Sequence, residues 1–159
     1  MRKLITGTIA LFCTIACMAA GLWQSGSGEV EWISQNAGNT IKDETAQKDV
    51  TPRIEFRCTP GDPTITARVD WSRFISSFST EVGFKVDDGR IMWLKWRVDG
   101  SEKVTYSPSG DDSARLIEAM KDGQTLTADV APYSEGPVVV TYDLAGFSES
   151  LDALRASCQ

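Results

Sequence analysis

Two Asp-Asp pairs are the candidate residues for acid–base chemistry in this 159-residue chain. They are Asp87-Asp88 and Asp111-Asp112, and two carboxylates can serve as acid and base in glycoside hydrolysis. Both also have structural reasons to be acidic, since the first precedes Gly89 in a turn and the second stands where a helix can begin. The chain has no histidine, which removes Ser-His-Asp and Cys-His nucleophiles and the commonest zinc sites. We therefore predict turn and cap roles for these carboxylates, and we expect no enzymatic activity, metal ion or cofactor.

The cysteines indicate a disulfide bond. Cys58 ends the run RIEFRC, where apolar residues alternate as in a strand with one buried face. Cys158 ends a helical stripe with apolar residues at intervals of four, three and four. Both cysteines should face the core, and two cysteines in an exported domain are more often a bridge than a reactive pair. We predict a disulfide between Cys58 and Cys158, joining the first strand of the domain to its last helix.

Export itself is indicated by residues 1–21. Arg2 and Lys3 precede an apolar stretch of about fifteen residues and then small residues, the pattern of a secretory signal peptide. We expect cleavage after Gly21, or nearly as well after Ala19, and a periplasmic or otherwise exported protein. Two alternatives remain, lipidation of Cys17 and retention of the segment as an inner-membrane anchor. The membrane would then be reached only through this uncleaved or lipidated N-terminus.

The charge of the remaining chain narrows the kinds of partner. Beyond residue 21 there are 14 basic residues, which is 16 less Arg2 and Lys3, and 22 acidic ones, a formal charge of −8. Such a surface repels nucleic-acid phosphates and anionic lipid head groups. We therefore expect no nucleic-acid partner.

An aromatic residue flanked by cations is the candidate binding surface. In the predicted strand 90–98, alternation places Trp93, Lys95 and Arg97 on the face opposite the core. Tryptophan and arginine are enriched among binding hot spots, so this face could anchor a partner. Alternatively, the second helix or the preceding linker covers Trp93 while both cations pair with carboxylates of neighbouring strands, and we favour this interpretation. The carboxylates available for such pairs are Glu55, Glu81 and Asp70.

The periodicity predicts a polar linker over residues 22–52 and an α+β domain over residues 53–159. We expect an antiparallel, curved sheet of about seven strands with two helices packed against it. The expected strands are 53–58, 64–71, 80–86, 90–98, 103–106, 125–133 and 138–144, and the expected helices are 111–121 and 147–158.

About 105 residues resemble the C-terminal half of the VasI/TagO family, accessory proteins associated with bacterial type VI secretion. The resemblance lies in Cys58 at the end of the first strand, Pro132-Tyr133, the run VTYDLAGF at 140–147, and Leu154-Arg155 shortly before Cys158. It implies an exported accessory or binding domain with no known chemistry, whose partner is another envelope protein. The family usually has a further N-terminal module with its own cysteines, where this chain has only the linker around Trp32.

Three functions follow from these observations. The first is a non-enzymatic envelope accessory or protein-binding domain. The second is a periplasmic inhibitor or immunity-type protein, with the acidic loop 86–90, which contains Asp87 and Asp88, as the part inserted into a target. The third is a hydrolase of envelope polysaccharide, which would need two carboxylates converging across a cleft.

Overall fold

The computed structural model describes residues 23–159, which form eleven strands and two helices. The predicted signal peptide at 1–21 and the alternative lipidation of Cys17 lie outside these residues. The first strands are β1 (Gln24–Gly26), β2 (Glu31–Asn36), β3 (Ile41–Asp43), β4 (Lys48–Val50), β5 (Arg53–Thr59) and β6 (Asp62–Asp70). They are followed by β7 (Ser79–Val86), β8 (Met92–Val98), β9 (Val104–Tyr106), α1 (Gly110–Met120), β10 (Thr125–Val130), β11 (Val138–Asp143) and α2 (Phe147–Ser157).

Nine of the strands form one antiparallel sheet in the order β1-β2-β5-β6-β9-β8-β7-β10-β11, and β3 pairs with β4 separately. The prediction of about seven strands is therefore wrong, although the α+β composition holds. The additional strands all come from residues 22–52, which we expected to be a linker. Alternation fails to reveal β2 because two polar residues, Ser34 and Gln35, are buried there, at 0% and 5% exposure.

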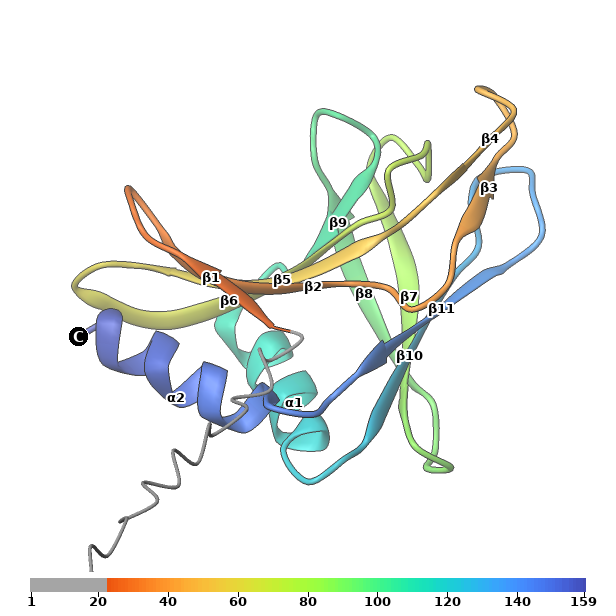
Figure 1. Ribbon diagram of the computed structural model, residues 1–159. Helices are drawn as coiled ribbons and strands as arrows, with labels where there is room; N and C mark the ends of the chain where they lie inside the picture. The colour runs from red at the N-terminus through yellow and green to blue at the C-terminus, as the bar shows by residue number, and fades with distance from the viewer. Residues whose placement is uncertain (1–22) are drawn as a thin grey trace, which may run out of the picture.

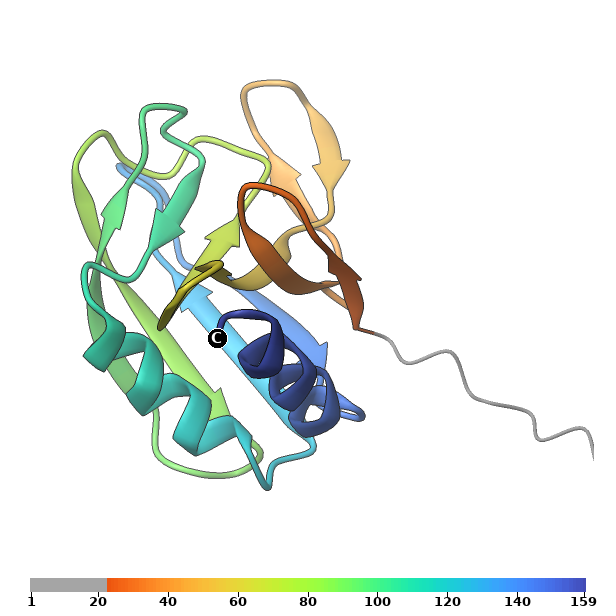
Figure 2. The same cartoon turned by 90° about the vertical axis from the view of Figure 1, so that its left-hand side faces the viewer.

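The large sheet curves around the core, and both helices cover its concave side. In Figure 1, β1, β2, β5 and β6 form an upper layer, β7, β8, β10 and β11 descend beside it, and α1 and α2 lie in the angle between them. Figure 2 shows the two helices next to each other in front of the strands. The largest fully buried side chains include Trp71, Trp96, Phe56 and Phe84. The helices thus leave the convex side of the sheet free for binding.

The two edges of this sheet offer little room for an added strand. At β11 the backbone N–H of Gly38 donates to the Thr141 carbonyl at 2.8 Å. The Asn39 side chain bonds the Val139 carbonyl at 3.0 Å and the Thr141 N–H at 2.9 Å. The other edge, β1, has three residues. Because edge strands bind through free backbone groups, the convex face of the sheet is the larger surface available to a partner.

Within residues 23–159, neither helix is long and apolar enough to cross a membrane.

Candidate binding surface

The outward face of β8 carries the residues that the sequence singled out. Leu94 and Trp96 point into the core, at 3% and 0% exposure, while Trp93 is 51% exposed. We name Trp93, Lys95 and Arg97, which share the exposed face, the β8 surface. The interpretation that we favoured, in which a helix or the linker covers Trp93, is wrong.

Trp93 is held in place by the glycine opposite it on β7. Gly83 is its direct cross-strand partner. A Cβ atom at Gly83 would lie 2.9 Å from Cζ3 of the indole, which shows that the ring lies over the glycine backbone. The absence of a side chain at position 83 thus lets the indole rest on the sheet while half of its surface faces solvent.

The two cations beside Trp93 do not form the expected ion pairs. Lys95 stands opposite Glu81 in the register, yet within residues 23–159 neither Lys95 nor Arg97 has a carboxylate oxygen within 4.0 Å. Glu55 instead lies 3.9 Å from Arg53 and 3.8 Å from Arg57. The β8 surface therefore presents two cations without a carboxylate partner in the described part of the chain.

The β8 surface continues across three further strands. Arg97 pairs in register with Tyr106 on β9, Tyr106 with Arg68 on β6, and Arg68 with Glu55 on β5. These residues therefore share one row on the outward face. The sequence analysis missed Arg57, Arg68 and Tyr106 as surface candidates, although the alternation of Arg53, Glu55 and Arg57 on β5 was a visible signal.

Asp87 of the first acidic pair has a structural role in the turn that the sequence predicted. The Asp87 carboxylate accepts the backbone N–H groups of Gln124 at 3.1 Å and Thr125 at 2.9 Å, and so ties the β7–β8 turn to the start of β10. Asp88 next to it is exposed.

At the second pair, Asp111 and Asp112 occupy the first turn of α1. The cap itself is Ser109, whose Oγ accepts the Asp112 N–H, so the predicted cap role of Asp111 and Asp112 is wrong. Carboxylates in a first turn interact favourably with the helix dipole.

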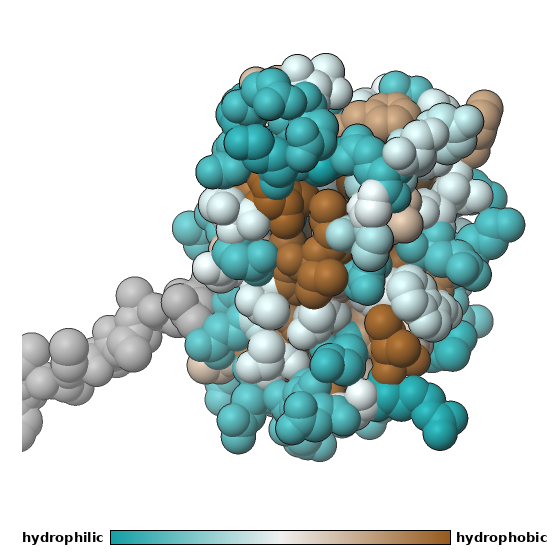
Figure 3. Space-filling model, turned by 90° about the vertical axis from the view of Figure 1, so that its right-hand side faces the viewer, coloured by the Kyte–Doolittle hydropathy of each residue, from teal (hydrophilic) through white to brown (hydrophobic). Residues whose placement is uncertain are grey.

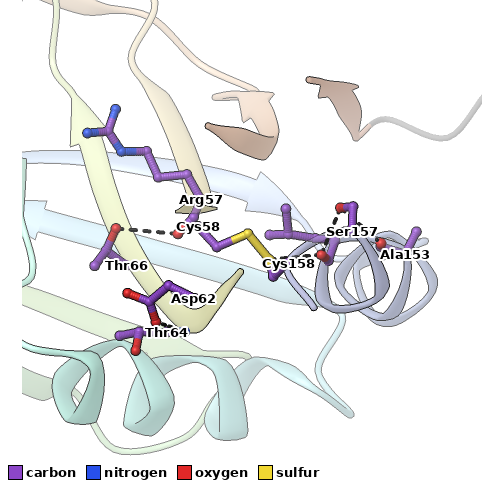
Figure 4. The surroundings of a disulfide bond; sticks show 9 residues. Arg57, Cys58, Asp62, Thr64, Thr66, Ala153, Ser157 and Cys158 are labelled. Carbon is purple, nitrogen blue, oxygen red and sulfur yellow. Dashed lines mark hydrogen bonds between the residues drawn. A yellow bond between two sulfur atoms is a disulfide. The ribbon is translucent and has the colours of Figure 1, made fainter. Parts of the chain in front are cut away.

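The predicted disulfide between Cys58 and Cys158 is present. It joins β5 to the end of α2 with a Cα–Cα distance of 5.9 Å, and the two residues are 3% and 0% exposed. The Gly61 N–H also donates to the Cys158 carbonyl at 3.0 Å. Figure 4 shows Arg57 pointing away from the bond, as alternation along β5 requires. The bond is thus a buried link of the core, and the neighbouring arginine belongs to the outward face.

Apolar groups also reach the surface on other parts of the molecule. Figure 3, which views the side where β11 and the β3–β4 hairpin lie, shows apolar residues gathered at the centre of that side among polar ones. Val139 on β11 is 44% exposed, and Phe78 and Tyr133 in loops are 84% and 75% exposed. Among residues 23–159, no group of three or more metal-ligating side chains is arranged to hold a metal ion.

No family model matches the chain, and no curated protein matches it either. The membership in the VasI/TagO family thus stays a prediction. The structure is similar to the crystal structure of invasion associated protein B from Bartonella henselae, with a TM-score of 0.52 and 17% sequence identity over 86% of this chain and 93% of that chain. At this identity the similarity establishes a shared fold, and the chain has the architecture seen in that protein.

Proposed function

We propose that the chain is an exported envelope protein that acts without catalysis, as an accessory or protein-binding domain of the kind that VasI/TagO proteins represent. The observation that carries this proposal is the β8 surface. A half-exposed tryptophan lies beside two cations without ion-pair partners in the described residues, on a domain whose formal charge beyond residue 21 is −8.

The chemistry of this surface favours a protein partner. Tryptophan and arginine contribute most to binding energy where they are held rigidly and become desolvated in a complex. Trp93 is already positioned over Gly83, so binding would cost little additional ordering of its side chain. Another envelope protein is therefore the expected partner, and the net negative charge disfavours nucleic acid or an anionic lipid surface.

Export is supported by the disulfide bond. Disulfides persist in the periplasm and outside the cell and are rare in the cytosol. The buried bond between Cys58 and Cys158 closes a sequence separation of 100 residues and fits an oxidising compartment.

The inhibitor and hydrolase alternatives receive less support. An inhibitory loop at 86–90 would present Asp88 alone, because the Asp87 carboxylate is engaged by the backbone of residues 124 and 125. For a hydrolase, the carboxylates named by the sequence lie in separate elements, because Asp87 bonds the backbone at the start of β10 while Asp111 and Asp112 occupy the first turn of α1.

Site-specific photocrosslinking in the native cells tests the proposal. A photoreactive amino acid replaces Lys95 in one variant and Lys121, the residue that caps the C-terminus of α1, in the control. We expect an adduct with one envelope protein at position 95, no such adduct at position 121, and loss of the adduct when W93A or R97E is added. Equal adducts at both positions, or an adduct unaffected by W93A and R97E, would contradict a binding role for the β8 surface.

A further inference from the structure

Two arginines on the outward face of β5 and β6 lie at neighbouring cross-strand positions. Arg57 pairs with Thr66, and Arg68 pairs with Glu55, so the arginines occupy diagonal positions of the same face. Long side chains at diagonal positions reach one another. Arg68 also pairs with Tyr106, which connects both arginines to the row that ends at Arg97 of the β8 surface.

The guanidinium groups on this face have carboxylates within ion-pair distance but no hydrogen-bonded acceptor. Glu55 is 3.8 Å from Arg57 and 3.9 Å from Arg53, and Asp99 is 3.6 Å from Arg68. These separations exceed those of hydrogen-bonded ion pairs. Within residues 23–159, no hydrogen bond from the guanidinium groups of Arg53, Arg57 or Arg68 meets the usual geometry, and the buried Nε of Arg53 has no acceptor. Each guanidinium therefore keeps N–H donors that no carboxylate of the described residues accepts in hydrogen-bonding geometry.

The surface is hollowed on both sides of this arginine pair. One hollow of ≈ 310 Å³ is lined by Arg57 and Arg68 together with Trp32 and Arg53. The other, of ≈ 610 Å³, is lined by the same two arginines together with Tyr106. The Arg53 guanidinium lies 4.8 Å from the centre of the Trp32 ring, which holds one wall in place. An incoming segment that crosses both hollows must therefore pass over Arg57 and Arg68.

The charges around the hollows favour a ligand with a single negative charge over a polyanion. Glu55 and Asp70 line the first hollow, and Asp99 lines the second. A polyanion such as a sulfated or phosphorylated polysaccharide would place further charges against these carboxylates, which would repel them. A single carboxylate between two guanidinium groups avoids this repulsion and matches their planar, forked donors.

We infer that Arg57 and Arg68 together bind a single carboxylate of an extended segment in a protein partner, and that this segment lies across the two hollows. The inference rests on the proposed protein-binding function and specifies the chemistry of the partner. Trp93 and Arg97 would contact the same partner further along the face.

An NMR titration of the chain recovered from the envelope tests this inference. The probe is a synthetic peptide with one glutamate flanked by serines, and the control peptide has glutamine in place of that glutamate. We expect the glutamate peptide to shift the Nε–Hε resonances of Arg57 and Arg68 saturably, and the glutamine peptide to leave them unchanged. R57Q and R68Q should each weaken binding about tenfold or more.

Matched variants separate a specific site from general charge attraction. R115Q removes the same charge from an exposed position on α1, and its affinity should equal that of the parent. R57K keeps the positive charge but loses the forked N–H donors of the guanidinium, so it should bind the peptide more weakly than the parent. Unchanged amide resonances away from the substituted residue would confirm that each variant is folded.

Three results would overturn the inference. They are equal weakening by R115Q, absence of saturation, and tighter binding of dextran sulfate than of the glutamate peptide at Arg57 and Arg68. The last result would assign the hollows to a polyanion. If the peptide fails while the crosslink at position 95 still depends on Trp93 and Arg97, the carboxylate site is wrong and the proposed binding function stands.

Discussion

Arg73 and Glu135 form an ion pair that joins two loops distant in sequence. Arg73 follows β6 and is 2% exposed, and its guanidinium donates to the carboxylate of Glu135 between β10 and β11. The same group also donates to the backbone carbonyl of Lys42 in β3. One buried cation thus connects the β3–β4 hairpin, the loop after β6 and the β10–β11 loop.

Replacing Glu135 by glutamine should destabilise the fold. The buried charge of Arg73 would keep only neutral acceptors, and we expect a loss of about 2 kcal/mol in the free energy of unfolding, measured by urea denaturation. The control is E118Q, which removes an exposed pair with Lys121 and should cost less than about 0.5 kcal/mol. Equal losses in the two variants would show that the buried pair has no special role.

Reduction of the bond between Cys58 and Cys158 should lower stability strongly. The bond spans a sequence separation of 100 residues, and a loop of this length restricts the unfolded chain by about 4 kcal/mol or somewhat more. Denaturation curves of oxidised protein and of protein reduced while unfolded would measure the difference. Coincident curves, or free thiols at both positions in the oxidised protein, would contradict the structural role of the bond.

Replacing Asp129 by asparagine should stabilise the protein at neutral pH. Burial raises the pKa of Asp129, and its Oδ1 is buried without a hydrogen-bond partner in the described residues. A raised pKa in the folded state means that ionisation favours unfolding, so this cost is absent at low pH and complete above the folded pKa. We expect D129N to gain up to about 1 kcal/mol near pH 7 and nothing near pH 3.

Asp62 provides the opposite control for this experiment. Its carboxylate accepts the Thr64 N–H at 2.9 Å, which lowers the pKa of Asp62. A lowered pKa gives stability above the unfolded pKa that disappears as the pH falls through the folded value. D62N should therefore be less stable than the parent near neutral pH and not in acid. The same pH dependence in D62N and D129N would contradict both assignments.

Replacing Tyr142 by phenylalanine should cost little or be stabilising. The residue is 1% exposed, its hydroxyl has no partner in the described part of the chain, and burial raises the pKa of Tyr142. Removal of an unpaired buried hydroxyl should raise the free energy of unfolding by between about 0 and 1 kcal/mol.

The matched comparison is T105V. Thr105 Oγ1 accepts the Nε1–H of the buried Trp71 at 3.0 Å. T105V leaves that donor unpaired and should cost about 1–2 kcal/mol, as measured by thermal or urea unfolding. A large loss in Y142F together with a neutral T105V would show that the hydrogen-bond assignments are reversed.

Local periodicity correctly predicted the features of the fold that depend only on residues close together in the sequence. Alternation located seven strand ranges that correspond to β5 to β11, and spacing placed Cys58 and Cys158 toward the core. The outward direction of Trp93, Lys95 and Arg97 followed from the same rule. Alternation identifies a face because successive side chains of a strand point to opposite sides.

Periodicity failed at β2 because one of its buried polar residues, Gln35, bonds a residue far away in the sequence. The Gln35 amide donates to the Asp143 carbonyl, 108 residues distant, at 2.8 Å. A polar side chain can enter the interior when such a partner exists, and a local pattern cannot reveal that partner. The stretch 22–52 therefore reads as a linker although it contributes β1 and β2 to the large sheet.

The candidate binding surface shows the same contrast between what local sequence patterns predict and what the tertiary structure adds. The sequence by itself determined that Trp93 faces away from the core, that Arg57 faces away from Cys58, and that the chain after residue 21 is acidic. Only the tertiary structure decided that Trp93 stays uncovered and that Arg57 and Arg68 become neighbours on one hollowed face. The reason is that side-chain direction follows from the local backbone, whereas exposure and cross-strand proximity depend on which distant segments pair and pack.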